Sequence, residues 1–189
     1  MNLCVFGSSS EQIGRIYIEK SELFGEELVK KGYGLVFGAG KYGVMGAVSR
    51  GAAKANGKTI IGVVPEFFKK RDVLSDNCTE LVFTKTMHER KKYMEDNSEA
   101  FIVLPGSIGT YDEFFETITL KQLYQHEKPI IIYNINGYFN PMIKMLEKAI
   151  DERFMTEACL KLFNLCNTSE EVFYAVENYT PNMYDKYEF

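Results

Sequence analysis

The residues best suited by type and spacing to do chemistry lie between Phe101 and Glu116, where an apolar run leads through a small loop into an acidic segment. This order predicts a buried strand, a turn without bulky side chains and a helix whose first turn faces that turn. A helix start presents unpaired N–H groups and the positive end of its dipole, and Gly106 and Gly109 let an anion approach the backbone closely. Thr110 adds a hydroxyl there. The pattern predicts a phosphate-binding loop.

The carboxylates that follow this loop have two interpretations. Thr110 and Glu113 have the spacing of a capping box, in which each side chain bonds the backbone N–H of the other residue. Glu113 could equally be a catalytic carboxylate, because the spacing is the same for both roles. Asp112 and Glu116 lie nearby, and three carboxylates beside one anion loop would repel a phosphate. We therefore expect at least one of them to point elsewhere or to have a role that justifies the repulsion.

A basic segment opens the helix that we predict over residues 87–97. Arg90, Lys91 and Lys92 would usually form a solvated face of that helix. A helix that begins just beyond a strand end could instead bring Arg90 to the phosphate loop, where a guanidinium can clamp phosphate or carboxylate with two hydrogen bonds. The spacing alone leaves both interpretations open.

A glycine-rich segment formally matches a dinucleotide-binding loop. Gly38, Gly40 and Gly43 have the G-x-G-x-x-G spacing, and Glu66 lies beyond the next strand, where a ribose-binding acid would be expected. That fingerprint normally follows the first strand, whereas here it follows the second, and 189 residues leave little room for a separate substrate domain. Glycines needed for a tight turn and close helix packing explain the match at least as well. We expect a nucleotide ligand rather than NAD.

Around these loops, short apolar runs alternate with longer amphipathic segments, a pattern that predicts strands alternating with helices. Apolar strands separated by helices indicate an α/β fold, here a Rossmann-like three-layer sandwich with a parallel sheet of about seven strands and helices on both faces. Because no linker or repeat interrupts the pattern, we expect residues 1–189 to form a single nucleotide-binding domain, with a tail at 180–189 too short to be a domain. We predict strands at 3–6, 34–37, 59–64, 80–84, 100–104, 129–133 and 163–166, and helices at 11–31, 43–56, 87–97, 110–125, 138–153 and 169–179.

Ligands of such open sheets bind beyond the carboxyl ends of the strands, at the point where the strand order reverses. Three loops that follow predicted strands are rich in small residues, at 7–10, 38–43 and 105–110. We therefore expect the binding site to be built from these three loops.

Composition and charge narrow the partners and the compartment. A net charge of -4 over 189 residues gives no basic footprint for nucleic acid, so we expect no such partner. No apolar run approaches the ~20 residues of a membrane span, and no basic leader precedes a long apolar stretch. Four cysteines without a C-x-x-C pair, with Cys4 inside an apolar run, favour buried or reduced thiols. We expect a cytoplasmic protein that enters no membrane.

Several catalytic classes have no signature in this sequence. His88 and His126 are the only histidines, and neither has a partner at metal-ligand spacing, so we expect no metal and place both at the surface or behind the site. The G-x-S-x-G elbow, the H-E-x-x-H helix and the Walker loop are also missing. The sequence thus argues against serine hydrolases, zincins and P-loop NTPases.

At these residues the chain resembles the LONELY GUY family of cytokinin riboside 5′-monophosphate phosphoribohydrolases, which often carry the label lysine decarboxylase-like. The family signature P-G-G-x-G-T-x-x-E reads Pro105-Gly-Ser-Ile-Gly-Thr-Tyr-Asp-Glu113 here. An Arg-Lys motif reads Met87-His-Glu-Arg-Lys91, and the glycine-rich segment that leads into G-x-M-G lies at 38–46. The resemblance runs from Cys4 through about Met155, and three ordered motifs together are far more specific than one.

The sequence departs from the family pattern at two positions. Ala39 and Ser107 stand where the family usually has glycine. Both replacements are small, but Ser107 would need a compatible backbone angle, because a residue with a Cβ is restricted at positive φ.

The resemblance implies a hydrolase, an N-glycosidase that splits a nucleoside 5′-monophosphate into a base and ribose 5-phosphate. The base would be of the purine type, either a cytokinin or adenine. The resemblance implies no cofactor. It implies two catalytic residues. Glu113 would stabilise the oxocarbenium-like ribosyl centre or activate water, and Arg90 would orient phosphate or carboxylate and balance charge. The substrate-binding residues that it implies are Ser8, Gly40, Met87, Lys91, Gly106, Ser107, Ile108, Gly109, Thr110 and Glu116.

The resemblance also implies a homodimer, because members of the family are dimers with sites near the subunit interface. The helix that carries Phe114, Phe115, Ile118 and Leu123 supports this, since it offers more apolar surface than one face requires.

Three other functions compete with this one. A non-catalytic nucleotide-binding or carrier module with the same loops would bind AMP-like ligands and release no base. An NAD-dependent oxidoreductase would leave Arg90 and Glu113 unexplained. A pyridoxal phosphate decarboxylase needs a Schiff-base lysine with a partner for the pyridinium, and no lysine stands in a distinctive sequence context.

Overall fold

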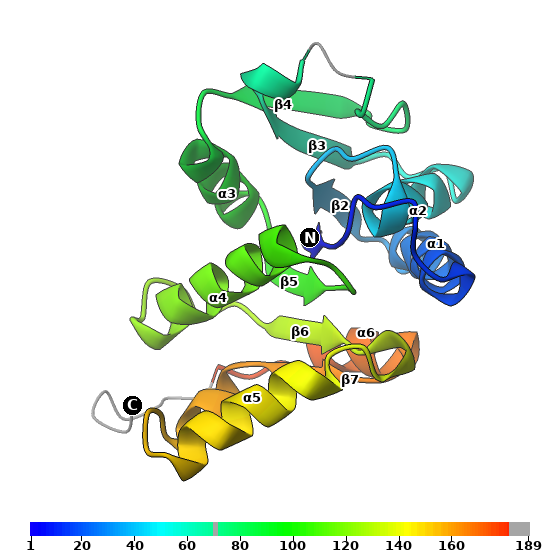
Figure 1. Ribbon diagram of the computed structural model, residues 1–189. Helices are drawn as coiled ribbons and strands as arrows, with labels where there is room; N and C mark the ends of the chain where they lie inside the picture. The colour runs from blue at the N-terminus through cyan, green and yellow to red at the C-terminus, as the bar shows by residue number, and fades with distance from the viewer. Residues whose placement is uncertain (70–71, 182–189) are drawn as a thin grey trace.

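A seven-stranded sheet forms the centre of the protein in the computed structural model, which describes residues 1–69 and 72–181 (Figure 1). The spatial order of the strands is β4-β3-β2-β1-β5-β6-β7, and every neighbouring pair is parallel. The seven strands and their parallel pairing confirm the predicted sheet. The strands are β1 (Asn2–Phe6), β2 (Gly34–Phe37), β3 (Ile60–Pro65), β4 (Glu80–Thr84), β5 (Ala100–Val103), β6 (Ile130–Tyr133) and β7 (Asn164–Cys166).

Six α-helices connect and follow these strands within the described residues. Their centres agree with the predicted helices, and most ends differ by one to four residues. They are α1 (Arg15–Lys30), α2 (Gly43–Lys54), α3 (Met87–Asp96), α4 (Ile108–Gln122), α5 (Asn140–Asp151) and α6 (Ser169–Glu177), with short 3-10 helices η1 (Glu66–Phe68), η2 (Ile135–Gly137) and η3 (Glu157–Leu162).

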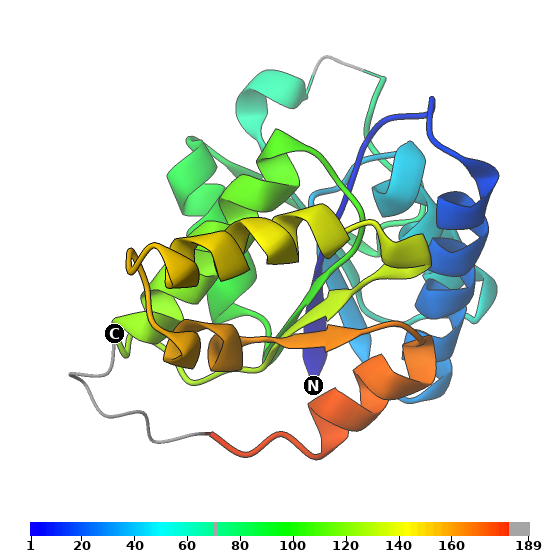
Figure 2. The same ribbon diagram turned by 60° about the horizontal axis from the view of Figure 1, so that its bottom comes forward.

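The helices form two layers on opposite sides of the sheet (Figures 1 and 2). Successive strand residues point to opposite faces, so Leu3 and Val5 pack in one buried cluster, whereas Cys4 and Phe6 pack in another. The first cluster contains apolar side chains of α1, α2 and α6, and the second contains those of α3, α4 and α5. The fold is therefore the predicted three-layer sandwich.

The strand order reverses between β1 and β5. The chain runs outward from β1 through β2 and β3 to β4, and then returns to place β5 on the other side of β1. The loops after β1 and β5 consequently lie at the switch point, and the N–H of Ser8 in the first loop donates to the carbonyl of Pro105 in the second at 3.1 Å. The topology thus brings two of the three small-residue loops together.

Two buried titratable side chains were not apparent from the sequence. His88 is exposed, as expected, but His126 is buried, with its ring Nε2 2.9 Å from the Thr117 carbonyl, and burial lowers its pKa to about 4. Lys121 is also buried and donates to the Leu162 carbonyl at 2.8 Å, and burial lowers its pKa to about 8. One lysine therefore does have distinctive surroundings.

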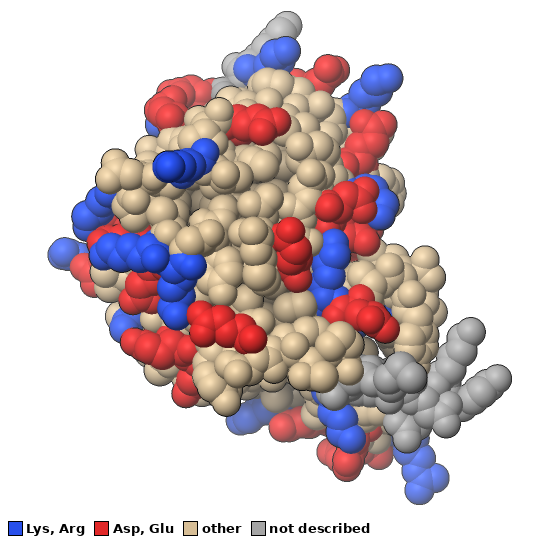
Figure 3. Space-filling model, turned by 180° about the vertical axis from the view of Figure 1, so that it is seen from behind, with Lys and Arg blue, Asp and Glu red and all other residues tan. Residues whose placement is uncertain are grey.

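Lys and Arg side chains are interspersed with Asp and Glu on the face shown in Figure 3. Within 1–69 and 72–181, no helix combines the length and apolar character needed to cross a membrane. The tail that we expected at 180–189 lies, from residue 182 on, outside the described part of the chain.

Candidate active site at the strand ends

A cavity of about 350 Å³ lies at the carboxyl ends of β1, β2 and β3 and the starts of α3 and α4. Its lining comes from the loops after β1 and β2, the β3–β4 connection and the starts of α3 and α4. Among the predicted site residues, those that line this cavity are Ser8, Gly40, Met87, Arg90, Ser107, Gly109, Thr110 and Glu113.

The start of α4 faces the cavity without a side-chain cap. Ser107 occupies the N-cap position but makes no capping hydrogen bond, whereas the N-cap Thr86 of α3 accepts one from the N–H of Glu89. The first N–H groups of a helix have no partner within the helix. At α4 these donors and the positive end of the helix dipole are therefore available to an anion.

Two glycines shape this helix start in different ways. A Cβ added at Gly106 would lie 2.0 Å from Oγ1 of Thr110, so Gly106 lets the threonine side chain pack against the loop. A Cβ added at Gly109 would meet nothing within 4 Å. The packing of the protein does not require glycine at 109, and the open space beside it belongs to the cavity.

A buried ion pair joins α3 to α4 at this cavity. Nη1 of Arg90 lies 2.6 Å from Oε1 of Glu113, and both side chains are less than a tenth exposed. Nε of Arg90 also donates to the Val63 carbonyl at 3.1 Å. Arg90 therefore does not belong to a solvated basic face. The capping-box interpretation of Thr110 and Glu113 is wrong, because α4 begins at Ile108 and the Glu113 carboxylate contacts Arg90.

The electrostatics of this pair are typical of a functional site. Burial raises the pKa of Glu113, and the charge of Arg90 opposes that rise. A buried ion pair is weak evidence for stability, since the loss of hydration opposes the attraction, whereas perturbed carboxyls in clefts are common at active sites. Gly38 makes room for the pair, because a Cβ there would lie 2.1 Å from Nη2 of Arg90.

A second set of ion pairs explains how three carboxylates fit beside one anion loop. Nζ of Lys91 lies 3.0 Å from Oδ2 of Asp112 and also contacts Oε2 of Glu116. Each of the three carboxylates thus has a cation. Lys91 and Glu116 line a neighbouring cavity of about 390 Å³ between α3 and α4, which Glu113 also reaches.

Two more predicted residues do not line the main cavity. The Ile108 side chain is 84% exposed, so only its backbone lies at the helix start. Gly106 lies behind the lining, against Thr110.

An apolar wall from the β3–β4 connection is part of the cavity that the sequence analysis did not identify. Phe68, Val73 and Leu74 contribute apolar side chains to its lining. The N–H of Lys41 donates to the Val73 carbonyl at 2.8 Å, which holds this segment against the loop after β2. The apolar Val-Leu pair in a polar connection was the available signal, but only loops rich in small residues were selected.

The two departures from the family pattern differ in backbone geometry. Ser107 has φ of -110°, an extended conformation that any residue adopts, so the expected restriction does not apply there. Ala39 is fully buried and has φ of 59°, in the left-handed region that favours glycine. The strained departure is therefore Ala39.

Neither a metal nor pyridoxal phosphate fits the residues present. Among the described residues, no three His, Cys, Asp or Glu side chains are grouped to hold a metal ion. A Schiff-base lysine must lose its proton, but the hydrogen bond to Asp72 raises the pKa of Lys41, the lysine that lines the main cavity. Lys121, whose pKa is lowered, lines neither cavity described above.

A doubly wound parallel sheet, with a cavity at its switch point lined by an uncapped helix start and a buried Arg–Glu pair, defines a Rossmann-like protein. The family model described as "Possible lysine decarboxylase" matches residues 45–176. Together with the relatives described next, this match shows that the chain belongs to the LONELY GUY, or lysine decarboxylase-like, family, which confirms the resemblance.

Curated relatives and a solved structure agree with this assignment. "Probable cytokinin riboside 5'-monophosphate phosphoribohydrolase LOGL2" of Oryza sativa is 36% identical over 95% of this chain and 73% of its own. "Cytokinin riboside 5'-monophosphate phosphoribohydrolase LOG3" of Arabidopsis thaliana is 35% identical over 95% of this chain and 83% of its own. The molybdenum cofactor carrier protein of Chlamydomonas reinhardtii has a TM-score of 0.71 at 20% identity, covering 93% and 95% of the two chains, a likeness of fold alone.

Proposed function

We propose that the protein hydrolyses the N-glycosidic bond of a nucleoside 5′-monophosphate, releasing a purine-type base, a cytokinin or adenine, and ribose 5-phosphate. The observation that carries this function is the buried Arg90–Glu113 pair beside the uncapped start of α4 in one cavity. The names of relatives about 35% identical over most of the chain support the same activity.

The phosphate of the substrate would bind at the start of α4. The N–H groups of Ser107 and Gly109 and the hydroxyl of Thr110 supply neutral donors there, and the helix dipole favours a negative charge. Ser8 lines the same cavity from the loop after β1. Because the nearby carboxylates are paired with Lys91 and Arg90, their charges oppose the phosphate less than free carboxylates would.

Glu113 would act at the ribosyl centre. Arg90 contacts Oε1 of Glu113, and we assign Oε2 to the cationic C1′ centre or to the attacking water. The bond between C1′ and the base nitrogen breaks, and its electron pair stays on the base. The water oxygen bonds C1′ and gives a proton to the Glu113 carboxylate. That proton then passes to the departing base, so that one water is added across the bond and the carboxylate is regenerated. Arg90 keeps the carboxylate oriented and compensates its charge.

The base would lie against the apolar wall of the cavity. Phe68, Val73, Leu74 and Met87 supply apolar side chains to the cavity lining. Burial of apolar surface stabilises a ligand by about 25 cal/mol per Å². This wall therefore favours a base that carries an apolar substituent, as a cytokinin does, over plain adenine.

We further propose that residues 1–189 form one domain and that two copies of the chain form a homodimer. We also propose that the protein is cytoplasmic and binds no nucleic acid. All four cysteines are free, which agrees with a reducing compartment. On α4, Phe115 and Ile118 are half-buried and Phe114 belongs to the core, and Leu123, which follows the last residue of the helix, is 60% exposed. The surface available to a second copy is thus smaller than the sequence suggested. Light scattering at micromolar concentration should return a mass near twice 21.7 kDa.

Incubation with AMP and with an N6-prenylated AMP, followed by chromatography of the free base, tests the proposed activity. We expect base release from at least one of them, faster from the prenylated nucleotide. A carrier module would bind the nucleotides and release no base from either, which would contradict the proposal. The matched nucleosides, which lack the phosphate, serve as controls and should react far more slowly.

A further inference from the structure

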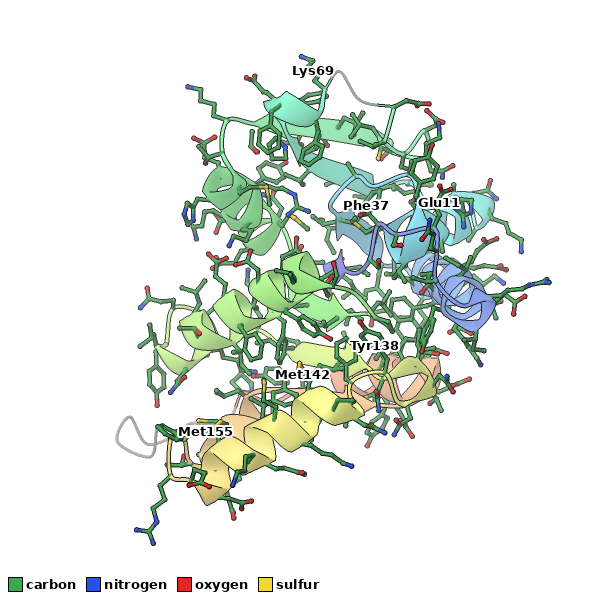
Figure 4. The ribbon with its side chains drawn as sticks, in the orientation of Figure 1. Glu11, Phe37, Lys69, Tyr138, Met142 and Met155 are labelled. Atoms are coloured by element: carbon green, nitrogen blue, oxygen red, sulfur yellow. The ribbon has the colours of Figure 1, made fainter. Side chains whose placement is uncertain are left out.

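A tyrosine from outside the three predicted loops holds the phosphate-binding loop. Tyr138 follows η2 in the connection between β6 and α5, and Figure 4 shows it between the start of α5 and the loop that leads into α4. Its hydroxyl donates to the carbonyl oxygen of Gly106 at 2.5 Å.

The connection that carries this tyrosine is itself firmly built. Asn134 is buried, and its Oδ1 accepts from the N–H of Phe139 at 2.8 Å while its Nδ2 donates to Oδ1 of Asn140 at 2.9 Å. The turn reverses at Asn136 and Gly137, whose φ angles are 53° and 69°. The hydrogen bonds of Asn134 and the turn that they close fix the backbone at residue 138, and therefore the direction in which its side chain points.

Packing fixes the ring as well as its backbone. Tyr17 of α1 contacts the Tyr138 ring edge-on, with 5.8 Å between the centroids, and Phe139 contacts it at 5.1 Å. The hydroxyl therefore reaches Gly106 from a ring with little freedom to move, which favours a directional role over an incidental bond.

The direction of the Gly106 carbonyl determines a donor in the cavity. In a trans peptide the C=O and the following N–H point in opposite directions. A hydroxyl that holds the Gly106 carbonyl therefore orients the N–H of Ser107, a residue that lines the cavity. The preceding carbonyl, that of Pro105, is held in turn by the N–H of Ser8. Both carbonyls that lead into α4 are thus tied to other loops.

We propose that Tyr138 is a positioning residue, which orients the Gly106–Ser107 peptide so that its N–H binds the 5′-phosphate of the substrate. The identity of the ligand rests on the proposed function. Tyr138 acts through Gly106, so its loss should affect recognition of the phosphate and leave the base and ribose contacts unchanged.

The test compares Tyr138→Phe with Tyr17→Phe, both in a Glu113→Gln background that suppresses turnover. Titration calorimetry measures the affinity for AMP and for adenosine, which lacks the phosphate. We expect Tyr138→Phe to weaken the affinity for AMP roughly three- to tenfold, which is the effect of one hydrogen bond, and to leave the affinity for adenosine unchanged. Tyr17→Phe keeps the ring contact and should change neither affinity.

Each outcome decides the proposal. Unchanged AMP affinity in Tyr138→Phe, or an equal loss for AMP and adenosine, would overturn it, because a merely structural tyrosine has no preference for the phosphate. Only the folded fraction of the protein binds AMP or adenosine. Partial unfolding of a variant would therefore lower the binding stoichiometry of both ligands but would not change the ratio of their affinities. If the unsubstituted protein releases no base, the proposed hydrolysis fails, yet the AMP-to-adenosine ratio still judges the role of Tyr138.

Discussion

Gly109→Ala should affect the stability of the fold and the binding of the ligand in opposite directions. Gly109 is the second residue of α4, and a Cβ at this position would meet nothing within 4 Å. Alanine is favoured over glycine in a helix by about 0.5–1 kcal/mol. The substitution should therefore leave the free energy of unfolding unchanged or raise it by up to that amount, as measured by urea denaturation.

The same methyl group should obstruct the ligand. A phosphate oxygen that accepts from the N–H of Gly109 would lie about 3 Å from that nitrogen, and the rest of the phosphate group would then occupy the open space into which the methyl is added. We expect AMP to bind at least ~10-fold more weakly by calorimetry, which corresponds to about 1.4 kcal/mol. This combination of a more stable protein with weaker binding would be difficult to explain by damage to the fold.

Gly14→Ala is the matched control, because a Cβ there has ordinary contacts of 3.6 Å and residue 14 does not line the cavity. It should leave AMP affinity unchanged. The reasoning would be refuted if Gly109→Ala bound AMP as tightly as the unsubstituted protein, since the phosphate would then lie elsewhere. A clear loss of stability would show that the space beside Gly109 is not open.

Two further predictions concern the Arg90 contact and a buried histidine. Gly38→Ala should displace the guanidinium of Arg90, because Nη2 of Arg90 would lie 2.1 Å from the new Cβ. We expect base release to fall at least ~10-fold with an unchanged circular dichroism spectrum. Full activity would show that Arg90 can move freely. Burial keeps His126 neutral by lowering its pKa from the usual 6.5 to about 4, so stability is lost as the pH falls from 6.5 toward 4. That loss should be about 1 kcal/mol between pH 7 and 5.5 in urea denaturation and should disappear in His126→Gln, whereas an identical pH profile in the variant would contradict the assignment.

The sheet was predictable because its strands are continuous apolar runs that need no tertiary information. β2 and β4 have the predicted bounds, since glycine or polar residues punctuate both runs. The arrangement at the start of α4 was harder to predict. The Thr110-x-x-Glu113 spacing satisfies a capping box, and only the position of Arg90 shows where the carboxylate goes. The pairing spans 23 residues and depends on the placement of α3 beside α4.

The remaining features of the site depend on contacts between loops that sequence spacing does not encode. Val73 and Leu74 became part of the cavity through a bridge between Gly40 and Leu74, and Tyr138 reaches Gly106 across 32 residues. Lys91 acquires two carboxylates from a different helix. Local patterns placed a helix after the small-residue loop but began it at residue 110 rather than Ile108, and the tertiary structure determined which side chains face the cavity.

Base release by Glu113→Gln tests the central claim most directly. Glutamine keeps the size and hydrogen-bonding capacity of Glu113 but removes the negative charge beside a cationic transition state. We expect turnover of an N6-prenylated AMP to fall by ~100-fold or more, with an unchanged circular dichroism spectrum. Glu89→Gln, the same change at an exposed carboxylate at the start of α3, should retain activity. Near-normal base release by folded Glu113→Gln would contradict the account.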